Sequence, residues 1–335
     1  MGPLTPTVLA RALSYLHAST GRGIPSLDLR IEPGETLALI GPNGSGKSTL
    51  LRMLATALPA KGSLELFGTP PQRRTTSKLR RRIGFAGDVA VHLEELSGRA
   101  NAVFFARAAG LSAPSATGRV EALLHRFELS AHGGEPVSAY SFGMRRKLLL
   151  VEALAHDPDL LLLDEPAVGL DAAARTTLWE ILAERADNGR TVVLATNDLR
   201  GLADHTDRVV FLLDGDLAAD AKPLELMASV AGTTSIEIAY EGGPPPVLVP
   251  VEGVVFRMAS GSLRAESRVG TGPLPTILEA LLAAGVSVRS VSVREPDLGD
   301  AFEALTGRRL ESKTVTPESP ELRRGTAVDG LEGRG

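Results

Sequence analysis

The sequence predicts an α/β protein whose main sheet is mostly parallel and covered by helices on both faces. Short, continuously apolar segments alternate with helical patterns over residues 1–225, and such runs are typical of strands buried on both sides. A Gly-rich turn and an Asp-Glu pair follow two of these segments, at the carboxyl ends where α/β sheets place ligands. The 43% hydrophobic content of the 335 residues is ample for globular cores.

Five buried strands are expected in this first part of the chain. In order they are residues 35–40, 82–86, 159–163, 191–195 and 208–213. An Ala- and Leu-rich helical stretch, residues 97–156, lies between the second and third strands. We therefore expect one domain over residues 1–230, with residues 97–156 as a helical subdomain.

The pattern changes after a turn near Gly232. Two strand patterns and two helix patterns follow, at residues 235–240, 286–293, 275–285 and 298–307. They predict a small α+β domain over residues 233–309. Residues 311–335 are polar and rich in Gly, Pro and charge, so we expect a disordered tail.

Composition excludes several classes of function. The chain has no cysteine, which rules out disulfides and thiolate metal sites. Its net charge of −4 gives no general affinity for nucleic acid. The basic run at 73–82 has no interleaved aromatic residues and reads as a solvated face before a strand. No apolar run approaches the ~20 residues of a membrane helix, and no signal peptide is evident, so we expect a soluble chain.

The strongest motif is GPNGSGKS at 41–48, which matches G-x-x-x-x-G-K-[ST] between a strand and an apolar helical run. Its glycines let backbone N–H groups turn inward around phosphate oxygens. Lys47 is expected to reach the β- and γ-phosphates, and the Ser48 hydroxyl to bind Mg²⁺. The motif predicts a nucleoside triphosphate site made by Gly41, Pro42, Asn43, Gly44, Ser45, Gly46, Lys47, Ser48 and Thr49.

A second element, DLLLLDEP, covers residues 159–166. Asp164 and Glu165 emerge at the carboxyl end of a buried strand. Asp164 suits a Mg²⁺ ion, and Glu165 suits a base that deprotonates the water attacking the γ-phosphate. The alternative is a plain turn after a strand, which the phosphate loop upstream makes less favoured.

The third element is YSFGM at 140–144, ahead of a long helical pattern. Ser141 stands where an N-cap is expected, and Gly143 leaves nearby N–H groups open to a second phosphate. From the local sequence alone, an ordinary capped helix is the favoured interpretation.

Together and in order, GPNGSGKST, YSFGM, LLLLDEP and VGLD resemble the ATP-binding subunit of ABC transporters over roughly residues 5–225. Residues 295–307, EPDLGDAFEALTG, resemble the closing pattern of the drug-resistance exporter branch. The resemblance implies a P-loop NTPase fold of the ABC type, with a RecA-like core plus helical subdomain and a small C-terminal α+β domain. It implies ATP and Mg²⁺ as cofactors.

The resemblance also implies partners. In this family two chains pair head to tail, so the YSFGM helix with Ser141 and Gly143 covers ATP held by the other chain. Gly169, Leu170 and Asp171 match the loop that touches the opposite site. The expected partners are a second ATP-binding subunit and a transmembrane permease subunit, on the inner face of the cell membrane, and no nucleic acid.

The sequence departs from the family pattern at two positions near the expected γ-phosphate. Asn197, in VVLATND, replaces a histidine, and an amide can donate a hydrogen bond but never carries charge. Asp88 replaces a glutamine that meets Mg²⁺ or water. A carboxylate there can bind Mg²⁺ but is repelled by phosphate. For the aromatic residue that stacks on adenine, Tyr15 and His17 are both candidates, and a core tyrosine is an equal alternative.

These residues predict an ATP-hydrolysing exporter subunit with Glu165, Asn197 and Asp88 as catalytic residues and Ser48, Asp164 and Asp88 as metal ligands. The alternative is a non-catalytic or slowly hydrolysing ATP-dependent clamp, one degenerate or regulatory half of a heterodimer. A soluble ABC ATPase acting on DNA or ribosomes is less favoured, because the chain is acidic and has a single cassette.

Overall fold

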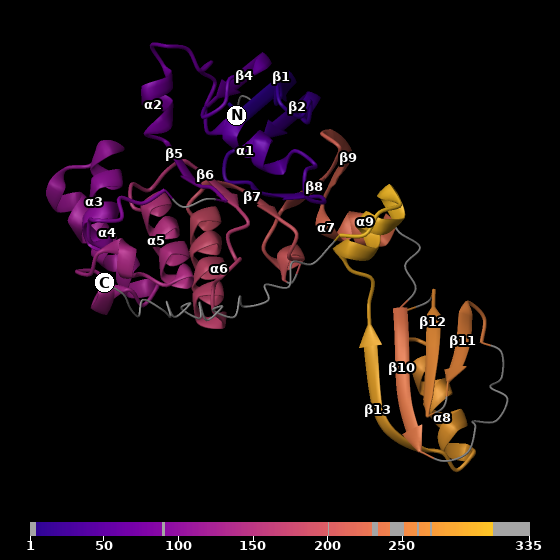
Figure 1. The fold of residues 1–335 in the computed structure, drawn as a ribbon. Helices are drawn as coiled ribbons and strands as arrows, with labels where there is room; N and C mark the ends of the chain where they lie inside the picture. Colours follow the sequence, from indigo (N-terminus) through magenta and orange to yellow (C-terminus); the bar gives the residue numbers. More distant parts are fainter. Residues whose placement is uncertain are drawn as a thin grey trace, which may run out of the picture.

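The computed structural model describes residues 5–88, 91–199, 201–229, 234–241, 251–259, 261–268 and 270–310. The expected tail at 311–335 and the turn near Gly232 lie outside these residues. Figure 1 shows a larger first domain and a separate small sheet near the C-terminal end. Within the described ranges, no helix combines the length and apolar character needed to cross a bilayer.

The main sheet confirms the predicted α/β class. Its strand order is β5 (Ile83–Ala86), β6 (Leu160–Asp164), β7 (Thr191–Thr196), β3 (Thr36–Ile40), β8 (Arg208–Leu213) and β9 (Asp216–Ala221). The first five strands run parallel, and β9 pairs antiparallel with β8. All five expected strands are present within two residues of their predicted limits.

A second sheet was not expected from the sequence. It is antiparallel, in the order β2 (Gly23–Ile31), β1 (Val8–Leu16) and β4 (Lys61–Leu66). One hydrophobic cluster joins this sheet to one face of the main sheet through helix α1 (Lys47–Leu54), whose Leu50 and Leu51 are fully buried. The helix that follows the phosphate loop is therefore held between two sheets (Figure 1).

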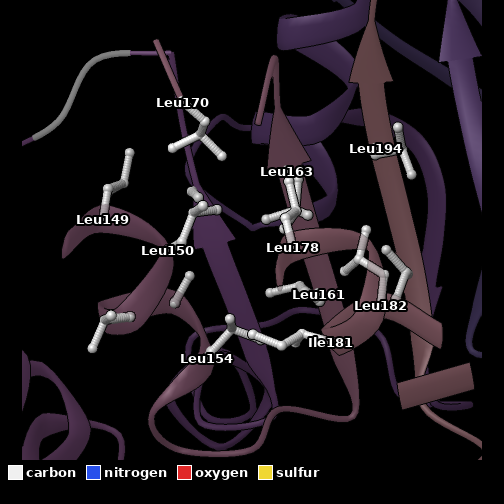
Figure 2. Packing of buried hydrophobic residues seen from close by; sticks show 14 of the residues in the cluster. Leu149, Leu150, Leu154, Leu161, Leu163, Leu170, Leu178, Ile181, Leu182 and Leu194 are labelled. Carbon is white, nitrogen blue, oxygen red and sulfur yellow. The ribbon is translucent and has the colours of Figure 1, made fainter. Parts of the chain in front are cut away.

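Helices cover the other face. They are α3 (Gly98–Ala108), α4 (Ala113–Arg126), α5 (Phe142–Leu154) and α6 (Ala172–Asp187), with the short 3-10 helices η1 (Ser130–His132), η2 (Val137–Ala139) and η3 (Leu202–Asp204). The short helix α2 (Thr76–Arg80) instead packs through Leu79 into the cluster around α1. Figure 2 shows leucines of α5 and α6 packed against Leu161 and Leu163 of β6. This leucine layer fixes α5 and α6 relative to the strand that ends in Asp164.

The small C-terminal sheet is antiparallel, in the order β11 (Val254–Ala259), β12 (Ser262–Ser267), β10 (Thr234–Glu241) and β13 (Ser287–Arg294). Helix α8 (Leu274–Ala283) packs on it through Ile277 and Leu281, which meet Ile236 and Ile238 in a separate core. Strands β10 and β13 and helix α8 match expected segments, whereas β11 and β12 were not anticipated.

After β13 the chain returns to the first domain. Helix α9 (Leu298–Thr306) lies beside α7 (Pro223–Ser229), and Leu298 and Phe302 are buried in the core cluster of the first domain. The Phe302 ring meets the Phe211 ring edge-on at 5.1 Å. Helix α9 lies within the range expected for the C-terminal domain, yet its apolar face belongs to the first domain's core.

Candidate functional site

The phosphate loop connects β3 to α1 at the carboxyl edge of the main sheet. Gly46 has a φ of +104°, a conformation that disfavours any residue with a Cβ. It is also the N-cap of α1 and brings no side-chain cap, so it does not occupy the helix's first N–H groups. The loop therefore presents backbone donors at a helix N-terminus, which suits phosphate oxygens.

Lys47 is folded back over this loop. Its side chain is almost fully buried, and Nζ donates hydrogen bonds to the backbone oxygens of Gly41 at 2.5 Å and Pro42 at 3.2 Å. Burying an ammonium group is costly unless it is hydrogen-bonded or paired with negative charge. The loop thus holds a positive charge where the phosphates of a nucleotide are expected.

Asp164 ends β6 directly beside the loop. Its carboxylate accepts a hydrogen bond from Ser48, and its Oδ2 atom is buried with no hydrogen-bond partner among the described residues. Burial raises the pKa of this carboxyl group, while the Ser48 hydrogen bond and the charge of Lys47 oppose the rise. A buried carboxylate oxygen beside a hydroxyl is the donor set that Mg²⁺ prefers, so these residues fit the ion.

These two side chains account for only part of a Mg²⁺ coordination shell. Within the described ranges, no group of three or more His, Asp or Glu residues is placed to hold a metal. Mg²⁺ in nucleotide sites takes one or two protein ligands and completes its shell with phosphate oxygens and water. A site that depends on the nucleotide is therefore consistent with the geometry.

Glu165 has a φ of +47°, a rare left-handed conformation for a residue with a side chain. Its N–H donates to the Ala195 oxygen at 2.8 Å. Its Oε2 atom accepts hydrogen bonds from the Thr196 hydroxyl and the Asn197 backbone N–H, both at 3.3 Å. The end of β7 therefore orients this carboxylate.

Asn197 is buried against the phosphate loop. Its Nδ2 atom donates to Oδ1 of Asn43 at 3.3 Å, and its own Oδ1 has no hydrogen-bond partner within the described ranges. His205, the histidine nearest in sequence, is exposed and stacks on Trp179 with ring centroids 4.8 Å apart. The strand VVLATND thus brings an amide, and not an imidazole, to the loop.

Asp88 lies near the same edge but is partly exposed. It forms an ion pair with Arg52 of α1 at 2.6 Å, and its charge contributes to the raised pKa of Asp164. Arg52 was not among the predicted site residues, although its place one turn after Ser48 puts it on the same helix face. Arg52 balances the negative charge that was expected to oppose phosphate binding.

Tyr15 and His17 lie together beside α1. Their rings meet edge-on at 5.0 Å, and Nε2 of His17 is 3.2 Å from the hydroxyl oxygen of Thr49. Tyr15 also packs partly against the core around α1. His17 therefore reaches the residue that ends the phosphate loop, and Tyr15 lies against His17 and the core.

The YSFGM segment forms one unit with the loop before α6. Ser141 caps α5, because its Oγ accepts from the Met144 N–H at 3.2 Å. A Cβ on Gly169 would collide with the Phe142 ring, which is itself 66% exposed. Lys147 of α5 pairs with Asp171, the N-cap of α6, at 2.8 Å. Ser141 and Phe142 are therefore exposed, and contacts with Gly169 and Asp171 hold the start of α5 in place.

Comparison with known proteins identifies the family. Residues 24–168 match the ABC transporter family. A daunorubicin resistance ATP-binding protein of Streptomyces coeruleorubidus is 35% identical over 290 residues, covering 85% of this chain and 92% of that protein. The chain belongs to the ATP-binding subunits of ABC transporters.

Other relatives of this ABC subunit agree. The Nod factor export ATP-binding protein I of Paraburkholderia xenovorans (strain LB400) is 36% identical over 292 residues, covering 86% of this chain and 93% of that protein. A solved ATP-binding subunit of an ABC transporter superposes with a TM-score of 0.62 and 26% identity, covering 67% of this chain and 92% of that one. The predicted P-loop fold and exporter-type resemblance are confirmed.

Proposed function

We propose that this ABC subunit hydrolyses ATP to power an exporter, as one of a pair of ATP-binding subunits attached to a separate transmembrane permease on the inner face of the cell membrane. The observation that carries the proposal is the buried Asp164 carboxylate, with Oδ2 unpartnered among the described residues, beside Ser48 and the charge of Lys47. The relatives named for daunorubicin resistance and Nod factor export support an export role.

In this proposal the chain's own residues bind and orient ATP. The N–H groups at the start of α1 and the Lys47 ammonium contact the phosphates, and Ser48 and Asp164 hold Mg²⁺. Mg²⁺, when bound, offsets the negative charge of the phosphate oxygens. Tyr15 or His17 contacts the adenine ring.

Hydrolysis requires a base close to the γ-phosphate. Glu165 accepts a proton from water, the water oxygen bonds to the γ-phosphorus, and the bond between that phosphorus and the β,γ-bridging oxygen breaks to give ADP and phosphate. Thr196 and the Asn197 N–H hold Oε2 of Glu165, which orients the carboxylate for this step. The Asn197 amide, which donates a hydrogen bond to Asn43 in this structure, donates to the γ-phosphate when ATP is bound.

The proposed dimer uses the exposed YSFGM surface. Ser141 and Gly143 of one chain approach the phosphates held by the other, with the α5 N-terminus contributing its dipole. The 66% exposure of the Phe142 ring supports an interface there, because large exposed aromatic side chains are enriched in such surfaces.

The permease is proposed to dock beside Asp88. A cavity of about 830 Å³ lies there between α1, α2, β5, α3 and α5. Phe85 and Phe105 line it with apolar surface, and Arg80 and Arg81 add positive charge. These features fit a helical segment with apolar and acidic side chains.

The second candidate is the ATP-dependent clamp, which binds ATP but hydrolyses it slowly or not at all. It is favoured by two features: the Asn197 side chain carries no charge, and the Asp88 carboxylate is engaged in an ion pair with Arg52. Turnover by the purified chain separates the two candidates. We expect Mg²⁺-dependent ATP hydrolysis, whereas ATP binding without turnover would favour the clamp.

Lys47→Ala tests the site assignment within this experiment. Removal of the buried charge should reduce ATP affinity or turnover at least about tenfold, a loss of about 1.4 kcal/mol or more. Lys61→Ala, which changes an exposed lysine at the start of β4, is the matched control and should behave like the parent. Equal binding and turnover in both variants would contradict the site assignment.

A further inference from the structure

Arg146 of α5 is a buried arginine whose hydrogen bonds go to the backbone of the candidate site. Its Nη1 atom donates to the Gly87 oxygen at 2.8 Å, and Nη2 donates to the oxygens of Asp164 at 2.5 Å and Glu165 at 2.6 Å. The residue is only 6% exposed. One guanidinium group therefore joins three carbonyl groups at the ends of two neighbouring strands, β5 and β6.

We propose that Arg146 is a positioning residue for ATP hydrolysis, holding the backbone that places both Glu165 and Asp88. The inference deepens the proposed function and rests on it. Arg146 does not act on the substrate in this account. It acts through the two residues whose backbone it fixes.

The conformation of Glu165 requires such support. The Asp164 and Glu165 oxygens belong to the two peptide groups that flank the Glu165 Cα, where φ is +47°. A left-handed conformation is unfavourable for a residue with a Cβ, so it persists only when the surroundings hold it. Hydrogen bonds from a charged donor are roughly twice as strong as neutral ones. Arg146 supplies them on both sides of the strained residue.

The third hydrogen bond, from Arg146 to the Gly87 oxygen, holds the backbone next to Asp88. The Gly87 oxygen belongs to the peptide group that precedes Asp88, so its position sets where the Asp88 side chain starts. A guanidinium is planar and rigid, and it carries donors pointing in several fixed directions. The ammonium group of a lysine is compact and flexible and cannot reproduce this fork. Arginine is therefore needed to hold β5 and β6 ends at a fixed separation.

The charge of Arg146 is also suited to this role. Burial lowers its pKa, and the negative charges of Asp164, Glu165 and Asp88 oppose that effect. The hydrogen bonds that Arg146 donates go to the backbone oxygens of Gly87, Asp164 and Glu165. The Glu165 carboxylate is oriented by Thr196 and Asn197 instead. The backbone and the side chain of Glu165 are thus held by different groups.

Arg146 also lies on the helix that Ser141 caps. The same helix therefore carries Ser141 at its N-terminus and, one turn later, the side chain that contacts the backbone on both sides of the Glu165 Cα.

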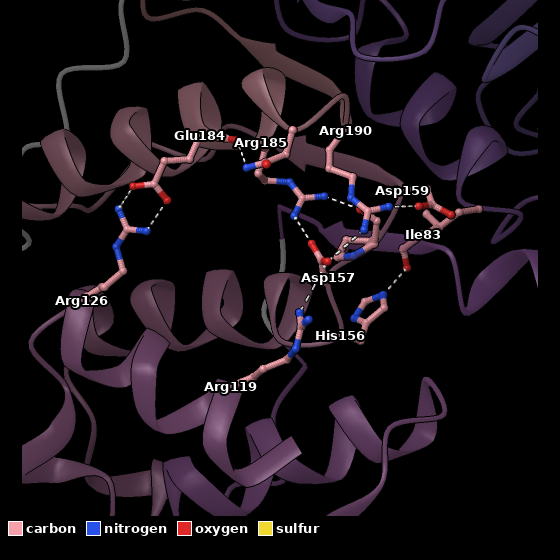
Figure 3. Close-up of polar contacts among 11 residues, drawn as sticks. Ile83, Arg119, Arg126, His156, Asp157, Asp159, Glu184, Arg185 and Arg190 are labelled. Atoms are coloured by element: carbon pink, nitrogen blue, oxygen red, sulfur yellow. Dashed lines mark hydrogen bonds and ion pairs between the residues drawn. The ribbon is translucent and has the colours of Figure 1, made fainter. Parts of the chain in front are cut away.

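The test compares Arg146→Lys with Arg185→Lys. Arg185 of α6 is similarly buried and donates to the Pro158 oxygen and to Asp157. Figure 3 shows its contact with Asp157, which precedes β6, at the opposite end of that strand from Asp164. For each variant, kcat and KM for ATP, nucleotide affinity by fluorescence titration, and backbone amide hydrogen exchange are measured on chains shown to be folded by circular dichroism.

We expect Arg146→Lys to lower kcat about 10- to 100-fold, as small displacements of catalytic groups do, with nucleotide affinity changed less than about threefold. Hydrogen exchange should rise in segments 83–88 and 164–168. Arg185→Lys should keep kcat and raise exchange only around residues 157–159. An unchanged kcat and exchange in Arg146→Lys, or equal loss of kcat in both variants, overturns the inference.

The parent chain separates this inference from the proposed function. A parent that binds ATP without turnover overturns the proposed hydrolysis, and amide exchange then decides whether Arg146 holds the two segments. A parent that turns over while Arg146→Lys matches it overturns the positioning role alone.

Discussion

Asn197 is the residue on which the proposed chemistry departs most from the family pattern. Its amide meets Asn43 of the phosphate loop, so it is placed to donate to a γ-phosphate but brings no charge. The effect of substituting Asn197 on turnover therefore shows whether the residue that follows β7 contacts the phosphate.

We expect Asn197→Ala to lower turnover at saturating ATP, because losing one donor to a developing charge typically costs about 2.7–4 kcal/mol. Asn197→His should match or exceed the parent. A cationic imidazole can pair with Asp88 instead, so Asp88→Gln is measured alone and combined with Asn197→His, where the effects need not add. Full turnover by Asn197→Ala would show that Asn197 does not serve the phosphate.

Asp164 predicts a dependence of stability on pH. Burial raises its folded-state pKa, so the unfolded chain loses this proton at lower pH than the folded chain. The free energy of unfolding therefore falls as pH rises from the ordinary carboxyl pKa through the folded one. Asp164→Asn removes this cost, and the variant should melt above the parent at pH 8 without nucleotide.

The same variant should approach the parent as pH falls below about 4, where the carboxyl is protonated in both states. Thermal unfolding between pH 4 and 8 measures this difference. Added ATP and Mg²⁺ should stabilise the parent more than Asp164→Asn. A difference that does not vary with pH would contradict this account of the buried carboxyl.

Local motifs predict some of the site residues and miss others. Lys47, Ser48 and Asp164 follow strands in recognisable patterns, and the structure places them together. Arg52 and Arg146 were not predicted, because their partners lie 36 and 59 residues away for the contacts with Asp88 and Gly87. Sequence spacing carries no information about such contacts.

At the scale of elements, continuous apolar runs predicted the buried parallel strands. Strands β1, β2 and β4 were missed because one face is exposed and the apolar residues are spaced out. In β2 two adjacent residues at the start, Gly23 and Ile24, are buried, and the alternation of Leu27, Leu29 and Ile31 covers only its second half. Strand β1 is further interrupted by register shifts on both sides of Leu13. Such irregular strands lack the simple period that pattern reading requires.

Helix α9 yields a prediction about packing between distant elements. Phe302 is fully buried against Phe211, so Phe302→Ala should reduce the free energy of unfolding of the first domain by about 3–5 kcal/mol. Urea unfolding followed by fluorescence of Trp179, the single tryptophan, reports on this domain. Leu305→Ala, on the exposed side of the same helix, is the control. Equal effects of the two substitutions would contradict the packing of α9.

At the scale of the whole molecule, the proposed function depends on two chains meeting. The YSFGM surface is exposed on one chain, and α5 also carries Arg146, which contacts the backbone of Glu165. Closure of a dimer around ATP and its release by hydrolysis are therefore expected to be linked. The clamp candidate predicts closure as well, but without release through Glu165.

Size-exclusion chromatography of Glu165→Gln with ATP and Mg²⁺ tests whether ATP binding closes the dimer and hydrolysis by Glu165 reopens it. The amide keeps the shape and hydrogen bonding of the carboxylate but cannot accept the proton. We expect the variant to accumulate as an ATP-bound dimer with turnover nearly abolished, while the parent hydrolyses ATP and remains mainly monomeric. A Glu165→Gln chain that hydrolyses ATP at the parent rate and forms no additional dimer would contradict the account.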